Sequence, residues 1–142
     1  MVQEGIYFAV LAAISFGLWT VFHQQASKFI NPIFGAILVS LTAVILGSFI
    51  LLPQMKGITL FTNQKGILFV VLAGLLAFGI DYFALRTYSS GINISVGGPV
   101  IIGGSIALAS IIGLFFLGEP ISLLKIFGIV LVVIGSSILA AL

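Results

Sequence analysis

The stretch PIFGAILVSLTAVILGSFILL, from Pro32 to Leu52, runs without a single charged side chain. A helix needs roughly 20 mainly apolar residues to cross the hydrocarbon core of a bilayer. Asn31 and Pro32 open the stretch, and proline suits the first turn of a helix. Pro53 follows its end, where a helix interior would not tolerate proline. The stretch therefore predicts one membrane-spanning helix with defined ends.

Similar runs occur on both sides of this stretch, and together they predict five spanning helices. We expect these helices over residues 6–22, 32–52, 66–88, 94–117 and 123–142. Hydrophobic residues make up 61% of the chain and charged residues only 6%, whereas soluble domains carry about 25% charged residues. The sequence therefore predicts an all-α membrane protein that forms one transmembrane domain over residues 1–142 and is surrounded by lipid. The first four residues carry no Lys or Arg, so we expect the first run to remain as a helix.

Several kinds of chemistry are excluded by composition. The chain has no cysteine and one histidine, whereas zinc sites use three or four protein ligands. No nucleophile-and-base set or phosphate-binding motif is present. The five basic residues are scattered, which argues against nucleic-acid binding. We therefore expect no enzyme activity, no cofactor, no metal and no nucleic-acid partner.

The basic residues give only a small orientation bias. Five spans place the termini on opposite sides, with Lys56, Lys65 and Lys125 on the N-terminal side and Lys28 and Arg86 on the other. Cytoplasmic loops are usually the ones richer in Lys and Arg. The bias favours a cytoplasmic N-terminus, and it is small enough for both orientations to be inserted.

Asp81 is an acidic residue inside the third expected helix. An ionised carboxylate at the centre of a bilayer costs about 2.5–3.5 kcal/mol on insertion scales. At 100° per residue, Asp81 shares a face of small and polar residues with Gly74, Ala77, Ala84 and Tyr88. Such a face suits a bundle interior or cavity, where Asp81 would bind a proton or cation. The alternative is a hydrated carboxyl near the membrane interface.

Polar and aromatic residues also mark one face of the first expected helix. Ser15, Trp19 and His23 follow each other at four-residue spacing. They predict one wall of a substrate pocket, with His23 near its mouth. The alternative is that Trp19 and His23 belong to the interfacial belt of amphipathic rings.

The fourth expected helix begins with residues that disturb helices. Asn93 precedes it, and Pro99 and two glycine pairs lie within it. This pattern predicts a kinked or partly unwound helix, of the kind that lines transporter sites, or else a bend needed for packing. Gly118 and Glu119 follow in the link to the fifth helix. We interpret them as a structural turn, with Ser122 as a helix cap.

Several of these segments resemble one repeat of the EamA family, within the drug/metabolite transporter superfamily. The strongest resemblance is in the C-terminal third. It rests on Ala84-Leu85-Arg86-Thr87-Tyr88, the helix that carries Pro99, Phe116-Leu117-Gly118-Glu119-Pro120-Ile121-Ser122, and residues 126–135. Phe16-Gly17-Leu18-Trp19 and Asn31-Pro32 resemble the first helix of the family and the start of its second. The chain departs from the family in two ways. It carries one repeat where most members carry two, and Gly35 to Ser40 lack the arginine that is common early in the second helix.

The resemblance implies export of small metabolites or drugs by alternating access, from a multi-pass protein of the inner (cytoplasmic) membrane. Two-repeat members have halves inverted relative to each other, and two oppositely oriented copies of this chain would recreate that inversion. We therefore expect an antiparallel homodimer. The alternatives are a heterodimer with another five-helix half and a non-transporting membrane scaffold or assembly subunit.

Overall fold

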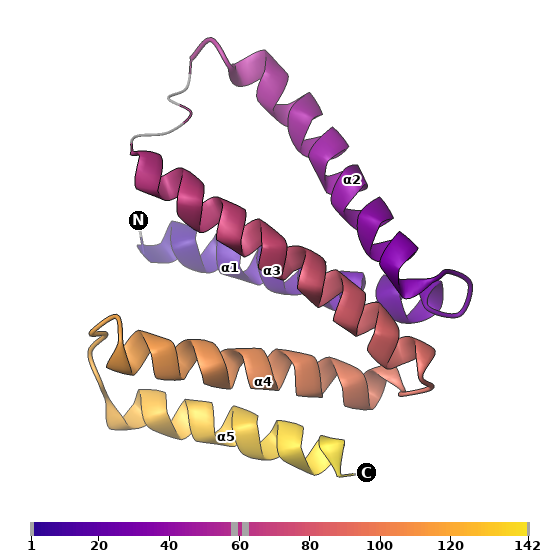
Figure 1. Ribbon diagram of the computed structural model, residues 1–142. Helices are drawn as coiled ribbons and strands as arrows, with labels where there is room; N and C mark the ends of the chain where they lie inside the picture. The colour runs from indigo at the N-terminus through magenta and orange to yellow at the C-terminus, as the bar shows by residue number, and fades with distance from the viewer. Residues whose placement is uncertain (1, 58–59, 61–62, 142) are drawn as a thin grey trace. The chain divides into compact units, whose positions relative to one another are not determined.

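The computed structural model describes residues 2–57, 60 and 63–141 and contains five α-helices in this part of the chain (Figure 1). They are α1 (Val2–Ala26), α2 (Pro32–Leu51), α3 (Gln64–Ser89), α4 (Ile94–Phe115) and α5 (Leu123–Ala140), with a short 3-10 turn, η1 (Leu52–Gln54), after α2. All five are long and apolar enough to span a membrane. The predicted all-α membrane architecture with five spans is confirmed.

The helix ends differ from the expected limits by a few residues. α1 starts at Val2 rather than 6 and continues to Ala26 rather than 22, so His23 lies within the helix. α4 ends at Phe115 rather than 117. α2 begins at Pro32 as expected, because Asn31 Oδ1 accepts a hydrogen bond from the amide of Ile33 at 3.0 Å. This contact satisfies one of the amides left open at a helix start.

The chain divides into two compact units. Unit 1 comprises Met1–Val21 and Ser90–Leu142, and therefore most of α1 with α4 and α5. Unit 2 comprises Phe22–Ser89, and therefore the last turn of α1 with α2 and α3.

In unit 2, α2 and α3 pack together at the start of α2 and the end of α3, and they diverge toward η1 (Figure 1). Glycine permits the close approach. A Cβ atom built on Gly35 would lie 2.6 Å from Leu85 Cδ1 and 3.2 Å from Ile30 Cγ2. Leu85 is 1% exposed and Ala36 is fully buried. The buried apolar contact of unit 2 therefore lies at this end of the two helices.

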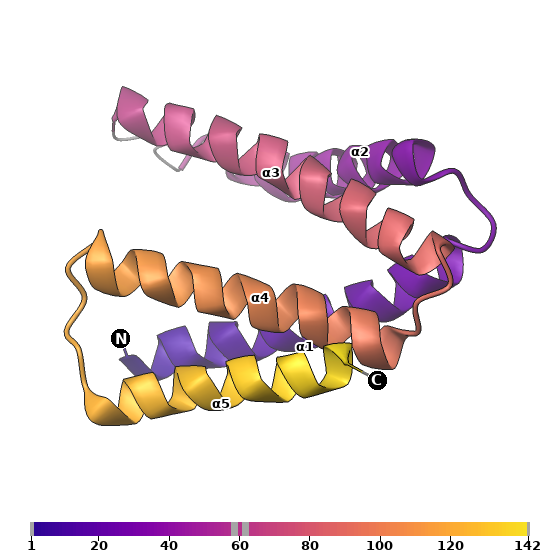
Figure 2. The same ribbon diagram turned by 60° about the horizontal axis from the view of Figure 1, so that its bottom comes forward.

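In unit 1, α4 and α5 lie side by side along their length (Figures 1 and 2). Gly103 is buried against Ser136, and a Cβ atom at Gly103 would lie 2.5 Å from Ser136 Cβ. α4 is helical through Pro99, so the partly unwound helix expected at this position is not observed. The glycines instead allow α4 and α5 to approach closely, as small residues commonly do between membrane helices.

The link between α4 and α5 is a hydrogen-bonded turn. Gly118 has a φ of +67°, which glycine adopts at little cost. The Glu119 amide donates to the carbonyl of Gly113 at 3.1 Å, and its carboxylate binds Lys125 Nζ at 2.9 Å. Ser122 Oγ accepts a hydrogen bond from the Lys125 amide at 3.2 Å and so caps α5, as the sequence predicts.

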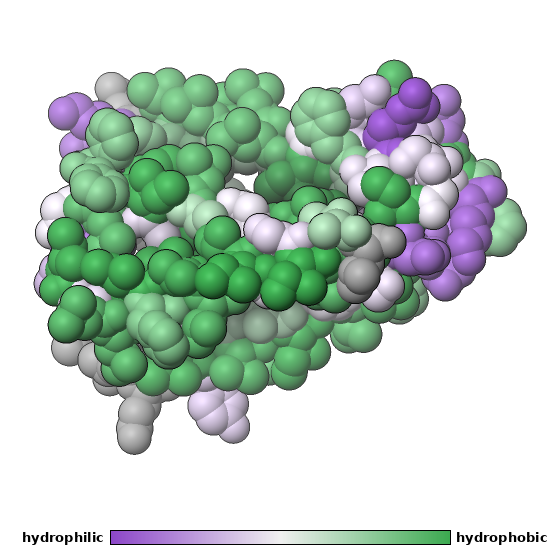
Figure 3. Space-filling model, turned by 90° about the horizontal axis from the view of Figure 1, so that it is seen from below, coloured by the Kyte–Doolittle hydropathy of each residue, from purple (hydrophilic) through white to green (hydrophobic). Residues whose placement is uncertain are grey.

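Apolar side chains face outward along all five helices. Only Ala36, Ala84, Leu85 and Tyr88 form a buried hydrophobic core among the described residues. Figure 3 shows hydrophobic side chains over most of the surface in view. A soluble protein does not expose apolar surface on this scale, so this surface fits a hydrocarbon environment.

Candidate functional site

The last turn of α1 and the second half of α3 meet through two ionisable side chains in unit 2. His23 Nε2 lies 3.1 Å from Asp81 Oδ1. His23 is 4% exposed and Asp81 is 7% exposed. Both residues lie within helices long and apolar enough to span the membrane. Ionisable groups at such positions usually pair with each other and mark proton, ion or substrate pathways.

On α3, the buried residues around Asp81 form a stripe along one face of the helix. Asp81, Ala84, Leu85 and Tyr88 are all buried, at spacings of three and four residues. Leu85 packs against Gly35 at the start of α2, and this contact fixes the rotation of α3 in unit 2. The same rotation brings Asp81 to His23. Gly74 and Ala77, which the sequence places on the same face, are exposed. The buried face therefore covers only the second half of α3.

Tyr88 ends this stripe, two helical turns after Asp81. It is 5% exposed, and its hydroxyl has no hydrogen-bond partner among the described residues. Leaving a buried hydroxyl unsatisfied costs about 1–3 kcal/mol. Groups of this kind are usually satisfied by ordered water or by a ligand. Tyr88 therefore offers a hydrogen-bond donor on the same face of α3 as Asp81.

Charge around the pair in unit 2 comes mainly from the two residues themselves. α2 contains no ionisable side chain. Arg86 is exposed on α3, and the exposed Lys28 Nζ donates to Gln25 Oε1 at 3.2 Å. The nearest described ionisable partner of Asp81 is therefore His23. No group of three or more His, Cys, Asp or Glu that could hold a metal occurs in the part of the chain described.

The remaining candidate residues belong to unit 1. Ser15 is exposed, and its hydroxyl donates to the Leu11 carbonyl at 2.8 Å. Trp19 stacks on Phe16, with ring centroids 5.0 Å apart. Asn93 precedes α4, where its carbonyl accepts the amide of Gly97 at 2.8 Å. Pro99 is half-buried inside α4. Of the predicted site residues, His23, Asp81 and Tyr88 therefore share unit 2.

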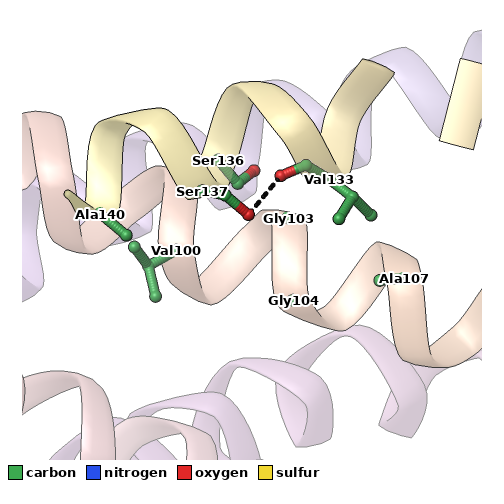
Figure 4. Close-up of a pocket in the computed structure, with 8 residues that line it drawn as sticks. All are labelled: Val100, Gly103, Gly104, Ala107, Val133, Ser136, Ser137 and Ala140. Atoms are coloured by element: carbon green, nitrogen blue, oxygen red, sulfur yellow. Dashed lines mark hydrogen bonds between the residues drawn. The ribbon is translucent and has the colours of Figure 1, made fainter. Parts of the chain in front are cut away.

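A groove on unit 1 was not predicted from the sequence. A groove of about 190 Å³ runs between α4 and α5 (Figure 4). Its lining consists of small and aliphatic residues: Val100, Gly103, Gly104, Ala107, Val133, Ser136, Ser137 and Ala140. Both serine hydroxyls donate to carbonyls of their own helix at 2.8 Å, Ser136 to Val132 and Ser137 to Val133. The groove therefore presents a mainly apolar surface.

The pairing of His23 with Asp81 is the feature of the site that sequence reasoning missed. The sequence indicates faces of two separate helices for these residues and no partner for either one. One signal was available, because His23 is the single histidine of the chain and ionisable groups within spans tend to pair.

Comparison with known proteins gives one match. The model of the EamA-like transporter family matches residues 3–141. Neither the curated proteins nor the solved structures contain a match to this chain. The family match covers all five helices and both members of the His23–Asp81 pair.

Proposed function

Given that the chain belongs to the EamA-like transporter family, we propose that it is a secondary transporter that exports small metabolites or drugs by alternating access. The family supports transport of small molecules by a multi-pass membrane protein. The five apolar helices and their outward-facing hydrophobic side chains support the same conclusion. We further propose that the protein acts in the inner (cytoplasmic) membrane.

One observation carries the finer proposal, namely the burial of Asp81 within an apolar helix. Asp81 is 7% exposed, and its carboxylate contacts His23 at 3.1 Å. A carboxylate at this position is costly unless it is paired, and a structural role alone is served equally well by an apolar side chain. We therefore assign Asp81 as the group that couples proton movement to transport, with the hydroxyl of Tyr88 as a donor to substrate or water.

Proteoliposomes with a trapped pH indicator test this assignment. Amino acids, nucleosides, sugars and an amphiphilic cation such as ethidium would be added in turn across a pH gradient. We expect at least one class to cause proton flux with the wild-type protein, and Asp81→Asn to abolish that flux. Glu119→Gln is the matched control, because Glu119 is an exposed carboxylate of unit 1. Solute-driven proton flux that persists in Asp81→Asn would refute the coupling role.

We also propose that two copies assemble in opposite orientations. With five spans the termini face opposite sides, and the basic residues are nearly balanced, with three on one side and two on the other. An inverted pair of identical halves would give the two-sided symmetry that alternating access uses.

Cysteine accessibility tests this arrangement cleanly because the natural chain has no cysteine. A single cysteine added beyond either terminus should react with an impermeant maleimide from both sides of the membrane. Adding two lysines beside Lys56 raises the count on that side from three to five, against two on the other, and should shift the labelling to one side. Labelling from one side with the natural charges would exclude the antiparallel homodimer and favour a heterodimer with another half.

A further inference from the structure

We propose that His23 and Asp81 form one proton-binding unit, in which the His23 imidazole takes up and releases the proton and the protonated unit holds the end of α1 against α3. This inference rests on the proposed transport function and adds a second residue to its coupling site. The reasoning starts from the contact between His23 Nε2 and Asp81 Oδ1 at 3.1 Å.

A contact of this length requires a hydrogen between the two atoms. Two arrangements of the pair carry no net charge: imidazolium with carboxylate, and neutral imidazole with carboxylic acid. Both hold the same number of protons. Removing one proton leaves a net negative charge, and adding one leaves a net positive charge. Either charge is costly away from water, so the neutral pair is the favoured form while the contact is closed.

Few other ionisable side chains of unit 2 lie near the pair and could change its net charge. α2, which packs on the same part of α3, contains no ionisable side chain. On α3 itself, Tyr88 is buried and Arg86 is exposed. In the last turn of α1, His23 is the ionisable side chain, followed by Gln24 and Gln25. A single proton therefore decides whether the pair is neutral.

The end of α1 has little apolar contact that would hold it in place without the pair. Phe22, next to His23, is 67% exposed, and Gln25 and Ala26 are exposed. The buried Ser27 hydroxyl donates to the Gln24 carbonyl within the same segment. The His23–Asp81 hydrogen bond joins this segment to α3. A change in the charge of the pair would therefore alter the contact between the end of α1 and α3.

The proton balance of the step is simple. In the closed state, imidazolium donates Nε2–H to the carboxylate. When α1 and α3 separate and water enters, the imidazolium N–H bond breaks and the proton passes to water, which leaves neutral His23 and ionised Asp81. Closing the contact again requires a proton from the other side. Imidazole suits this exchange because its charge changes between about pH 5 and pH 8.

The single histidine makes a direct test possible, because every histidine signal of the protein belongs to His23. The full chain would be labelled with ¹⁵N-histidine, placed in lipid nanodiscs and followed by NMR from pH 5 to pH 9. At pH 7 we expect the imidazolium spectrum in the wild type and its loss, with a neutral ring, in Asp81→Asn. Glu119→Gln should match the wild type. A ring spectrum in Asp81→Asn that follows the wild type at every pH would overturn the proposal.

A double variant in which the two residues change places shows whether the loss of signal in Asp81→Asn comes only from misfolding. In His23→Asp combined with Asp81→His, the two groups swap helices, and the imidazolium spectrum should return at pH 7. His23→Gln should preserve a hydrogen bond to Asp81 and abolish solute-driven proton flux. The two proposals fail separately. Flux that persists in His23→Gln contradicts the role of His23 but leaves the transporter intact, whereas paired NMR behaviour without flux for any solute contradicts only transport.

Discussion

Gly103→Ala should loosen the α4–α5 pair of unit 1, and the geometry gives the size of the effect. The new Cβ atom would lie 2.5 Å from Ser136 Cβ, whereas carbon atoms in contact prefer about 3.5–4.0 Å. A Cβ atom cannot rotate away from its own backbone, so the helices must separate by about 1–1.5 Å at this position. Overpacking of this kind costs about 1–3 kcal/mol. The folded-to-unfolded ratio should fall roughly 5- to 150-fold.

Reversible unfolding in mixed micelles of mild detergent and dodecyl sulfate would measure this loss, by circular dichroism. Gly104→Ala is the matched control, since a Cβ atom there meets nothing within 4 Å. It should leave stability unchanged or raise it by up to about 1 kcal/mol, because alanine favours helix. Combining Gly103→Ala with Ser136→Gly removes the clash and should restore most of the stability. Equal stability of the two alanine variants, or no recovery in the double variant, would refute the reasoning.

Two further substitutions should reduce stability in the same assay. Gly35→Ala places a Cβ atom 2.6 Å from Leu85 Cδ1 and should cost about 1–3 kcal/mol, whereas Gly47→Ala on the same helix meets nothing within 4 Å and should cost nothing. A Gly35→Ala protein as stable as Gly47→Ala would show that Leu85 has room to move. Gly118→Ala forces a side chain into a φ of +67° and should cost about 1–2 kcal/mol. Gly118→Asn should cost less, because asparagine tolerates this conformation better, and the reverse order would contradict the role of the turn.

The sequence predicts the helices well because each one depends on local properties. Long uncharged runs define the spans. Asn31 and Ser122 mark two helix starts, because a side-chain oxygen at that position accepts a nearby backbone amide. Pro99 and its neighbouring glycines predicted a kinked or partly unwound helix, and the unwound form is not observed. Proline removes one hydrogen bond, and the rest of α4 stays helical around it.

The site is harder to predict because it depends on contact between helices. His23 and Asp81 are 58 residues apart in the chain. The periodic pattern of one helix does not predict which residue of another helix it will contact. That contact follows from the rotation of α3, which Leu85 and Gly35 set through their close approach. Of the small polar face that the sequence indicates, Asp81, Ala84 and Tyr88 are buried, whereas Gly74 and Ala77 are exposed.

The unequal lengths of the helices bear on the kind of membrane that suits this protein. α5 has 18 residues and α3 has 26, which correspond to about 27 Å and about 39 Å of helix. A bilayer interior about 30 Å thick is slightly too deep for the first and too shallow for the second. The longer helix can accommodate the mismatch by tilting, whereas the shorter helix thins the bilayer around it. The thickness of the bilayer therefore affects how well each helix fits, and thinner bilayers should accommodate α5 with less distortion.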